Sequence, residues 1–356
     1  MPRELERPLD AQDRRARPGS ASTISDNLET GHDSCTDRMN HLIYRSAGNV
    51  AVPPPLAVPV TPVIPLGRHG TCDVFAKRED LVDPLGLGFK VRKVRWTFAR
   101  AKADGVTDVI LDGVNDSGCC AAAASLGDAF SLRVHVFFRG ERPERPTGRL
   151  LHSLDSATSA EFVDPTKPAD AAKLRKADEI REQGGVPRVL PIGLSTPESV
   201  WAGIELAAQI CTYEEEVAAP FDAVIVPVGT AGTVFSLDVG GFLLSRPWQV
   251  VGVCIDDESP ADYAPALAEH RRNAQTLFPE LPDAGGLQLV SLSDHRGYQI
   301  PSARAAEEAR TISSRYGLTF DQTYVAKAWA GALEWLEDHP SIRRALFVVT
   351  GGQLEG

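Results

Sequence analysis

The segment GLGFKVRKVR, residues 86–95, has the residue types of an anion-binding site. It carries four cations, Lys90, Arg92, Lys93 and Arg95, around an apolar turn where a helix is predicted to begin. Like charges so close together are unfavourable unless an anion is held beside them. The spacing of three residues puts Lys90 and Lys93 on the same helix face. The segment therefore predicts a local basic pocket with an anionic ligand.

A second segment, GTAGT, follows an apolar strand predicted at residues 223–228. Its residues are Gly229, Thr230, Ala231, Gly232 and Thr233. A backbone with few side chains can close on a phosphate with its N–H groups, and threonine hydroxyls add donors. Together the two segments predict a phosphate-bearing cofactor beside a lysine.

Six motifs occur in an order and spacing that resembles a known enzyme family. They are KREDL (77–81), GFKVRK (88–93), GVNDSG (113–118), GTAGT (229–233), TYVAKAWAG (323–331) and TGG (350–352). The family comprises the pyridoxal-phosphate enzymes related to D-cysteine desulfhydrase and 1-aminocyclopropane-1-carboxylate deaminase, and the resemblance runs from residue 61 to the C-terminus. It implies the two-lobed tryptophan synthase β-like fold (fold type II), an α/β fold in which each lobe is a mostly parallel sheet covered by helices.

The resemblance implies pyridoxal 5'-phosphate as cofactor, with Lys90 bonded to it and acting as base at the substrate α-carbon. Lys93 and residues 229–233 are expected to hold the phosphate. In the family, the residue after the motif tyrosine that corresponds to Tyr324 is Glu or Thr and contacts the nitrogen of the pyridine ring. This chain has Val325 at that position, so Thr350 is the remaining candidate for the contact. A hydroxyl leaves that nitrogen largely unprotonated, which suits elimination better than a long-lived carbanion.

The resemblance also implies that Ser117, Gly118 and Cys119 bind the substrate carboxylate, with Tyr298 and Tyr324 facing the substrate. Other interpretations stay open: Ser117 fits a helix N-cap, each tyrosine could be a buried residue with a satisfied hydroxyl, and Cys119 could be a small core residue.

Besides Val325, two positions depart from the family pattern. The family has an asparagine after the serine, which holds the 3'-oxygen of the pyridine ring, where this chain has Gly118. The asparagine usual before the lysine is Phe89. A ring contact is then missing unless Asn115 or a water replaces it.

These residues predict a lyase or deaminase that acts on a small amino acid by α-proton abstraction and β-elimination, releasing ammonia and a 2-oxo acid. Racemisation or β-replacement in specialised amino-acid biosynthesis is one alternative. A non-catalytic cofactor-binding protein, with a site decayed at Phe89, Gly118 and Val325, is another.

Composition limits the remaining classes. A net charge of −11 argues against nucleic acid as a partner. No apolar run is long enough to span a bilayer, and no secretory signal is expected. The six cysteines lack metal spacing, so no metal is predicted and a reducing cytoplasm is the expected compartment. The family resemblance makes a homodimer the expected assembly.

Hydrophobic periodicity divides the chain into strands that alternate with helices, which implies parallel sheets covered on both faces. Strands are predicted at 73–77, 107–111, 132–138, 161–163, 188–191, 223–228, 249–254 and 345–349. Helices are predicted at 91–103, 118–126, 147–154, 169–183, 197–212, 303–316 and 326–338, with one more after GTAGT. We expect a disordered extension at 1–50, a large cofactor-binding domain at 51–103 plus 192–356, and a small inserted domain at 104–191.

Overall fold

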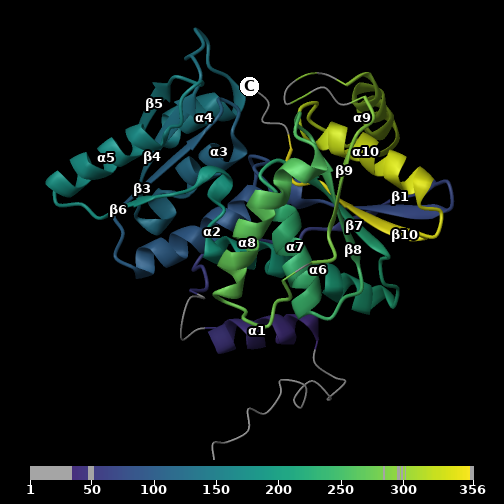
Figure 1. Cartoon of the computed structure of the whole chain (residues 1–356). Coiled ribbons are helices and arrows are strands. Elements are labelled where there is room, and N and C mark those ends of the chain that lie inside the picture. Colours follow the sequence, from purple (N-terminus) through teal and green to yellow (C-terminus); the bar gives the residue numbers. More distant parts are fainter. Residues whose placement is uncertain are drawn as a thin grey trace, which may run out of the picture. The chain divides into compact units, whose positions relative to one another are not determined.

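The computed structural model describes residues 34–46, 52–283, 285–294, 297, 300 and 302–352. Within them the chain forms two sheets, one of six strands and one of four. Figure 1 shows helices against both sheets. Among the described residues, no helix combines the length and apolar character needed to cross a bilayer.

The six-stranded sheet has the order β1-β2-β10-β7-β8-β9. Its strands are β1 (Val63–His69), β2 (Cys72–Lys77), β7 (Ala223–Val228), β8 (Gln249–Cys254), β9 (Gln288–Ser291) and β10 (Arg344–Val348). The pairing is parallel except between β1 and β2. Successive residues of β7 alternate between two core clusters, so Val224 and Val226 pack on one face and Ile225 packs on the other. Both faces of this sheet are therefore buried.

Helices cover both faces of the six-stranded sheet (Figure 1). On one face lie α6 (Val200–Val217) and α7 (Gly232–Leu243), with α8 (Ala264–Gln275) packed against α7. On the other face lie α9 (Ala303–Tyr316) and α10 (Val325–Asp338).

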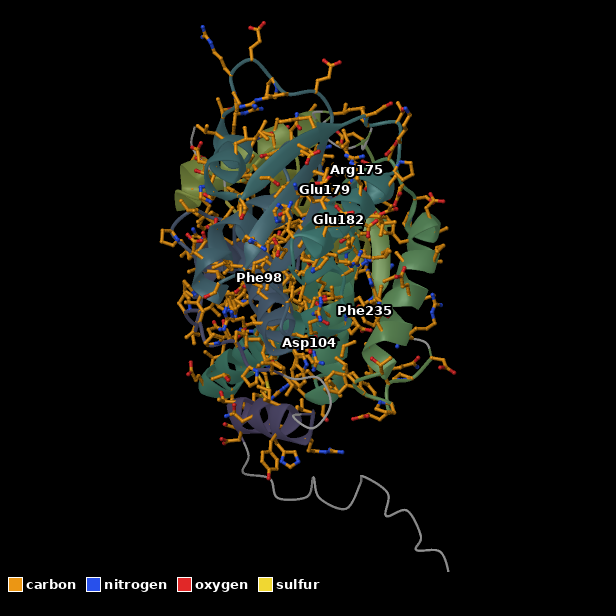
Figure 2. All side chains as sticks on the ribbon, turned by 90° about the vertical axis from the view of Figure 1, so that its left-hand side faces the viewer. Phe98, Asp104, Arg175, Glu179, Glu182 and Phe235 are labelled. Atoms are coloured by element: carbon orange, nitrogen blue, oxygen red, sulfur yellow. A yellow bond between two sulfur atoms is a disulfide. The ribbon has the colours of Figure 1, made fainter. Side chains whose placement is uncertain are left out.

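The four-stranded sheet is parallel, in the order β5-β4-β3-β6. Its strands are β3 (Asp108–Gly113), β4 (Arg133–Arg139), β5 (Ser159–Val163) and β6 (Pro187–Val189), and its helices are α2 (Phe89–Ala103), α3 (Gly118–Leu126), α4 (Gly148–Ser156) and α5 (Asp170–Glu182). Figure 2 shows Arg175, Glu179 and Glu182 along the outer side of α5, whereas Phe98 is fully buried. All four strands lie within residues 104–191, which supports the small domain that we propose at those residues.

Residues 34–46 differ from the predicted extension, because Cys35–Ser46 forms α1. The helix places Met39, Leu42 and Ile43 on the core beside α6. Cys35 forms a disulfide with Cys211 of α6, a pairing that the sequence analysis did not anticipate. The remainder of the extension, residues 1–33 and 47–50, lies outside the described residues.

A buried charge network anchors α2. Arg92 Nε donates to Glu79 Oε2 at 2.6 Å and its Nη2 donates to Oε1 at 3.0 Å, with both side chains fully buried. Thr61 Oγ1 also donates to Glu79, and Lys77 Nζ donates to the Thr61 carbonyl and, at 2.8 Å, to Gln209 of α6. Burial opposes ionisation of Glu79, but Arg92 outweighs it and lowers the pKa of the carboxyl. The network ties β2, α2 and α6 together.

We expect Glu79→Gln to lower the free energy of unfolding by about 3 kcal/mol, because it removes the bidentate carboxylate from the buried Arg92 guanidinium and leaves it only Glu205, 3.1 Å from Nη1. Urea unfolding followed by circular dichroism measures the change. The control is Asp73→Asn, which breaks an ion pair with Arg68 whose side chains are 66% and 53% exposed; it should cost at most about 1 kcal/mol. Equal losses in the two variants would contradict the anchoring role of the network.

Candidate active site

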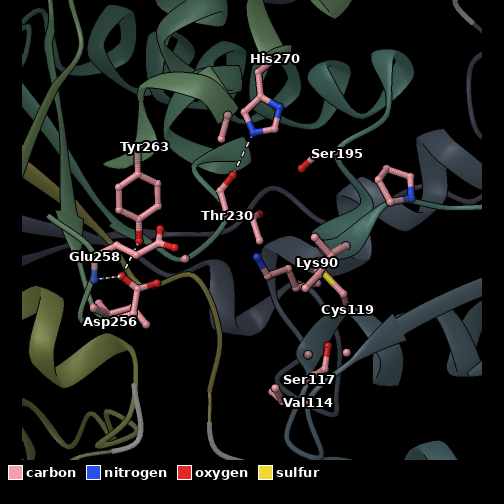
Figure 3. A pocket seen from close by; sticks show the side chains of 18 of the residues that line it. Lys90, Val114, Ser117, Cys119, Ser195, Thr230, Asp256, Glu258, Tyr263 and His270 are labelled. Atoms are coloured by element: carbon pink, nitrogen blue, oxygen red, sulfur yellow. Dashed lines mark hydrogen bonds between the residues drawn. The ribbon is translucent and has the colours of Figure 1, made fainter. Parts of the chain in front are cut away.

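A pocket of about 620 Å³ lies at the carboxyl ends of parallel strands from both sheets. Its wall includes Gly113 at the end of β3, Arg139 at the end of β4 and Gly229 immediately after β7. Figure 3 shows Lys90 in this pocket, with Ser195, Thr230 and His270 on one side and Ser117 and Cys119 on the other.

Lys90 is the second residue of α2, because the helix begins at Phe89, two residues earlier than predicted. Its Nζ lies 5.9 Å from the centre of the Tyr324 ring. Burial lowers the pKa of the Lys90 amine, but the nearby Tyr324 phenol and Cys119 thiol favour the charged form more, and the pKa is raised overall.

The start of α2 is held against the end of β10. Phe89 N donates to the Thr350 carbonyl at 2.9 Å. Gly88 has φ +65°, and a Cβ there would lie 2.2 Å from the Thr350 oxygen, so only glycine fits. This close approach fixes where Lys90 enters the pocket and brings Thr350 beside it.

An anion cradle lies where α2 meets the start of α7. A Cβ on Gly232 would come within 2.9 Å of Lys93 Nζ and 3.1 Å of Ser195 Oγ, so the glycine leaves open a space that both groups face. Ser195 Oγ is buried without a hydrogen-bond partner, and Lys93 Nζ donates to the Gly193 carbonyl at 2.6 Å. An ammonium, an orphaned hydroxyl and the N-terminus of a twelve-residue helix are a donor set that fits a phosphate.

The five predicted GTAGT residues take different positions. Gly229 and Thr230 line the large pocket, and Gly232 lines the cradle. Ala231 and Thr233 are buried and are not among the lining residues. Ala231 takes a left-handed conformation (φ 56°) that turns the chain into α7.

The cradle perturbs the titration of its basic groups. Burial, together with the charge of Lys90, lowers the pKa of the Lys93 amine to about 7. His270 Nε2 donates to the Thr230 carbonyl at 2.9 Å, and burial lowers the pKa of this imidazole. Without a bound anion, Lys93 and His270 therefore lose their protons more readily than they would in water.

Ser117, Gly118 and Cys119 all line the large pocket at the start of α3. Ser117 Oγ accepts a hydrogen bond from Cys120 N at 3.3 Å, so the N-cap interpretation is confirmed. The Cys120 thiol faces the core, and burial raises its pKa to about 12. The free Cys119 thiol is the one that borders the pocket.

Tyr324 precedes α10 and lines the large pocket beside Lys90. Asp321 accepts hydrogen bonds from the Tyr324 and Val325 amides at 2.7 and 3.2 Å, which fixes this helix start. Burial raises the pKa of the Tyr324 phenol. Tyr298, the other predicted tyrosine, lies outside the described residues.

A second pocket of about 80 Å³ shares Lys90, Gly118 and Tyr324 with the large one. Val325 and Thr350 line it. The structure thus brings Thr350 into the neighbourhood of Lys90, as the sequence predicted.

The prediction that all four cations of α2 face one anion site is wrong. Arg92 pairs with Glu79, and Arg95 Nη1 lies 3.1 Å from Glu205 Oε2. These two arginines are neutralised by protein carboxylates, so Lys90 and Lys93 are the two that reach the site.

Asn115 does not replace the missing asparagine contact. Its Nδ2 donates to the Glu141 carbonyl at 3.0 Å, and Asn115 lines neither pocket. Phe89 is fully buried in the core cluster beside α6.

The polar lining residues that sequence reasoning missed include Ser195, His270 and Arg149. Each comes from a segment without a motif, so no local pattern marks them. Ser195 carried one weak signal, because it follows a predicted strand and precedes a predicted helix.

The pyridoxal-phosphate dependent enzyme family model matches residues 55–351. A D-cysteine desulfhydrase of Salmonella paratyphi B is 29% identical over 310 residues, which cover 81% of this chain and 88% of the relative. A solved homologue of ACC deaminase superposes with a TM-score of 0.76 at 23% identity, over 87% of this chain and 94% of its own. A solved pyridoxal 5'-phosphate-dependent aspartate racemase gives 0.58 at 13% identity, over 91% and 97% of the two chains.

These matches confirm the predicted α/β fold of parallel sheets covered by helices, and they agree with the phosphate-fitting cradle beside Lys90. The chain belongs to the family of pyridoxal-phosphate dependent enzymes.

Proposed function

We propose that this enzyme is a lyase or deaminase that acts on a small amino acid by α-proton abstraction and β-elimination. One observation carries the proposal: the Lys90 amine lies between an anion cradle and the start of α3, with the Tyr324 ring beside it. The similarity to a D-cysteine desulfhydrase supports the same reaction class.

Lys93, Ser195 and the start of α7 at Gly232 would hold the cofactor phosphate, and Lys90 would hold its aldehyde carbon. The bound cofactor supplies an electron sink for the substrate α-carbon. When substrate takes its place on the cofactor, the free Lys90 amine is the base that removes the α-proton.

The substrate carboxylate would bind at the N-terminus of α3, where Ser117, Gly118 and Cys119 border the pocket. Tyr324, whose ring centre lies 5.9 Å from Lys90 Nζ, would give a proton to the departing β-substituent. Its raised pKa keeps the phenol protonated at neutral pH, as a proton donor requires.

The proposed reaction balances without an oxidant. The bond from Cβ to its substituent breaks as the α-proton leaves, and the substituent departs with a proton. The aminoacrylate that remains takes up water and yields a 2-oxo acid and ammonia.

We further propose a homodimer in the cytoplasm. The family resemblance supports the dimer. Four free cysteines among the described residues support a reducing compartment, and they are Cys72, Cys119, Cys120 and Cys254. A Cys35–Cys211 pair that stays oxidised in cells would contradict that compartment. Light scattering after gel filtration tests the first point, and the redox state of this pair in intact cells tests the second.

A panel of D- and L-amino acids tests the reaction. The protein loaded with pyridoxal 5'-phosphate should be yellow, lose that band with sodium borohydride, and release a 2-oxo acid and ammonia in equal amounts from at least one small amino acid. Lys90→Ala should lose the borohydride-sensitive band and lower kcat by at least about 10²-fold. The control is Lys102→Ala, an exposed lysine at the far end of the same helix.

Three outcomes would contradict the proposal. An inverted isomer without 2-oxo acid would indicate a racemase, and a new side chain on the amino acid would indicate β-replacement. A yellow protein whose spectrum responds to no amino acid would indicate a non-catalytic binder.

The phosphate contact of Lys93 predicts pH-dependent binding of pyridoxine 5'-phosphate, which has no aldehyde to bond with Lys90. The free-state pKa of Lys93 is about 7, and a bound phosphate favours its charged form, so above pH 7 binding takes up a proton. We expect Kd to rise up to about tenfold per pH unit between pH 7 and 9. Lys90, whose pKa is raised, stays charged throughout this range.

Titration calorimetry in buffers of different ionisation enthalpy measures the proton uptake. Lys93→Gln should bind about 10- to 100-fold more weakly at pH 7, since it loses a charge-assisted hydrogen bond. It should also lose the pH slope. If the variant keeps the wild-type slope, the phosphate does not contact Lys93.

A further inference from the structure

Arg149 is a partly buried arginine whose Nε–H has no hydrogen-bond partner. It is the second residue of α4, and its side chain is 15% exposed. Nη2 donates to the Gly352 carbonyl at 2.6 Å, and Nη1 lies 3.3 Å from Asp116 Oδ2. Nε is buried and has no partner. A buried unpaired N–H is costly, so this atom indicates a place for an acceptor.

The free donor is next to the residue that departs from the family pattern. Arg149 lines the small pocket together with Gly118 and Lys90. A Cβ on Gly118 would lie 3.9 Å from Arg149 Nε and 3.6 Å from Lys90 Cγ. The guanidinium therefore borders the space that a side chain at position 118 would enter.

The carboxylates in this pocket do not use the Nε donor. Asp321 accepts from the amides of Tyr324 and Val325, and Asp116 is 45% exposed and faces Nη1. Arg149 is the guanidinium among the described lining residues, and its charge offsets theirs.

The covalent structure of the cofactor places an acceptor on this side. On the pyridine ring, the carbon that bears the aldehyde has two ring neighbours: one carries the methylene group to which the phosphate is attached, and the other carries the 3'-oxygen. If the aldehyde carbon is at Lys90 and the phosphate is in the cradle, the 3'-oxygen faces away from the cradle. The small pocket lies next to Lys90, and its lining includes no cradle residue.

We propose that Arg149 supplies the N–H donor to the cofactor's 3'-oxygen, in place of a side chain at position 118. The inference rests on the proposed function. A permanently charged guanidinium stabilises this oxygen as an anion more strongly than a neutral amide does. The visible band of the bound cofactor should therefore keep its deprotonated form to lower pH than in a site without this cation.

The test is a pH titration of the visible absorbance of protein loaded with pyridoxal 5'-phosphate. Arg149→Leu should raise the midpoint of the titration by at least about one pH unit, because it removes the cation beside the oxygen. Arg149→Lys, which keeps the charge, should shift it less. The control is Arg175→Leu on the outer side of α5, where the arginine is 62% exposed (Figure 2); it should not move the midpoint.

A rescue variant separates a contact with the ring from a purely structural effect. Gly118→Asn adds an amide at a position where a Cβ meets only ordinary van der Waals contacts. In the Arg149→Leu background it should return the midpoint at least halfway to the wild-type value. If Arg149→Leu does not load, recovery of the band in the double variant supports the proposal, and failure to recover overturns it.

The failures are distinguishable. A wild-type protein without a borohydride-sensitive band overturns the proposed function and this inference with it. A loaded wild-type protein whose midpoint is unchanged in Arg149→Leu overturns the role of Arg149 and leaves the proposed function intact.

Discussion

The buried ion pair between Glu79 and Arg92 is the interaction on which the position of the site depends. Helix α2 carries two pairs of cations, each spaced by three residues, so each pair occupies its own face. Arg92 and Arg95 turn toward protein carboxylates, and their pairing holds the helix against β2 and α6. Lys90 and Lys93 are thereby presented on the opposite face, at the carboxyl ends of the strands. Since removing one member of a buried pair leaves an uncompensated charge, the helix has little freedom to rotate.

The same arrangement leaves two ammonium groups and a helix N-terminus facing an open space. In the free protein this is costly, and the depressed pKa of Lys93 shows how the protein accommodates it: the amine gives up its proton more readily. An anion in the cradle reverses that balance, because it favours the charged amine and satisfies the orphaned Ser195 hydroxyl. Cofactor binding and fold stability are thus coupled, and any ligand that binds the native state alone adds to the free energy of unfolding.

Hydrophobic periodicity is sufficient to predict most of the strands and helices that are buried in the core. The predicted bounds of α3, β7, β8 and α9 are those of the structure. The helices and strands that it missed include α1 and α8, which are polar, and β1 and β9, which are the two edge strands of the six-stranded sheet. The site divides in the same way. Lys90, Gly229 and Ser117 stand in local motifs and were predicted to lie together, whereas the pairing of Arg92 with Glu79 is invisible without the fold.

Gly118 stands where the family has an asparagine, and it shows why a departure from a motif is poor evidence that a site has lost its function. Locally, glycine removes a polar side chain and only backbone remains. In space, the absence of that side chain leaves room beside Lys90 for the guanidinium of Arg149, which comes from α4, 31 residues further along the chain. The sequence around Arg149 has the pattern of an exposed helix start, so it does not predict a partly buried cation there. A donor lost from one element can be supplied by another, and because the replacement is charged, the ring contact would be changed in kind and not simply lost.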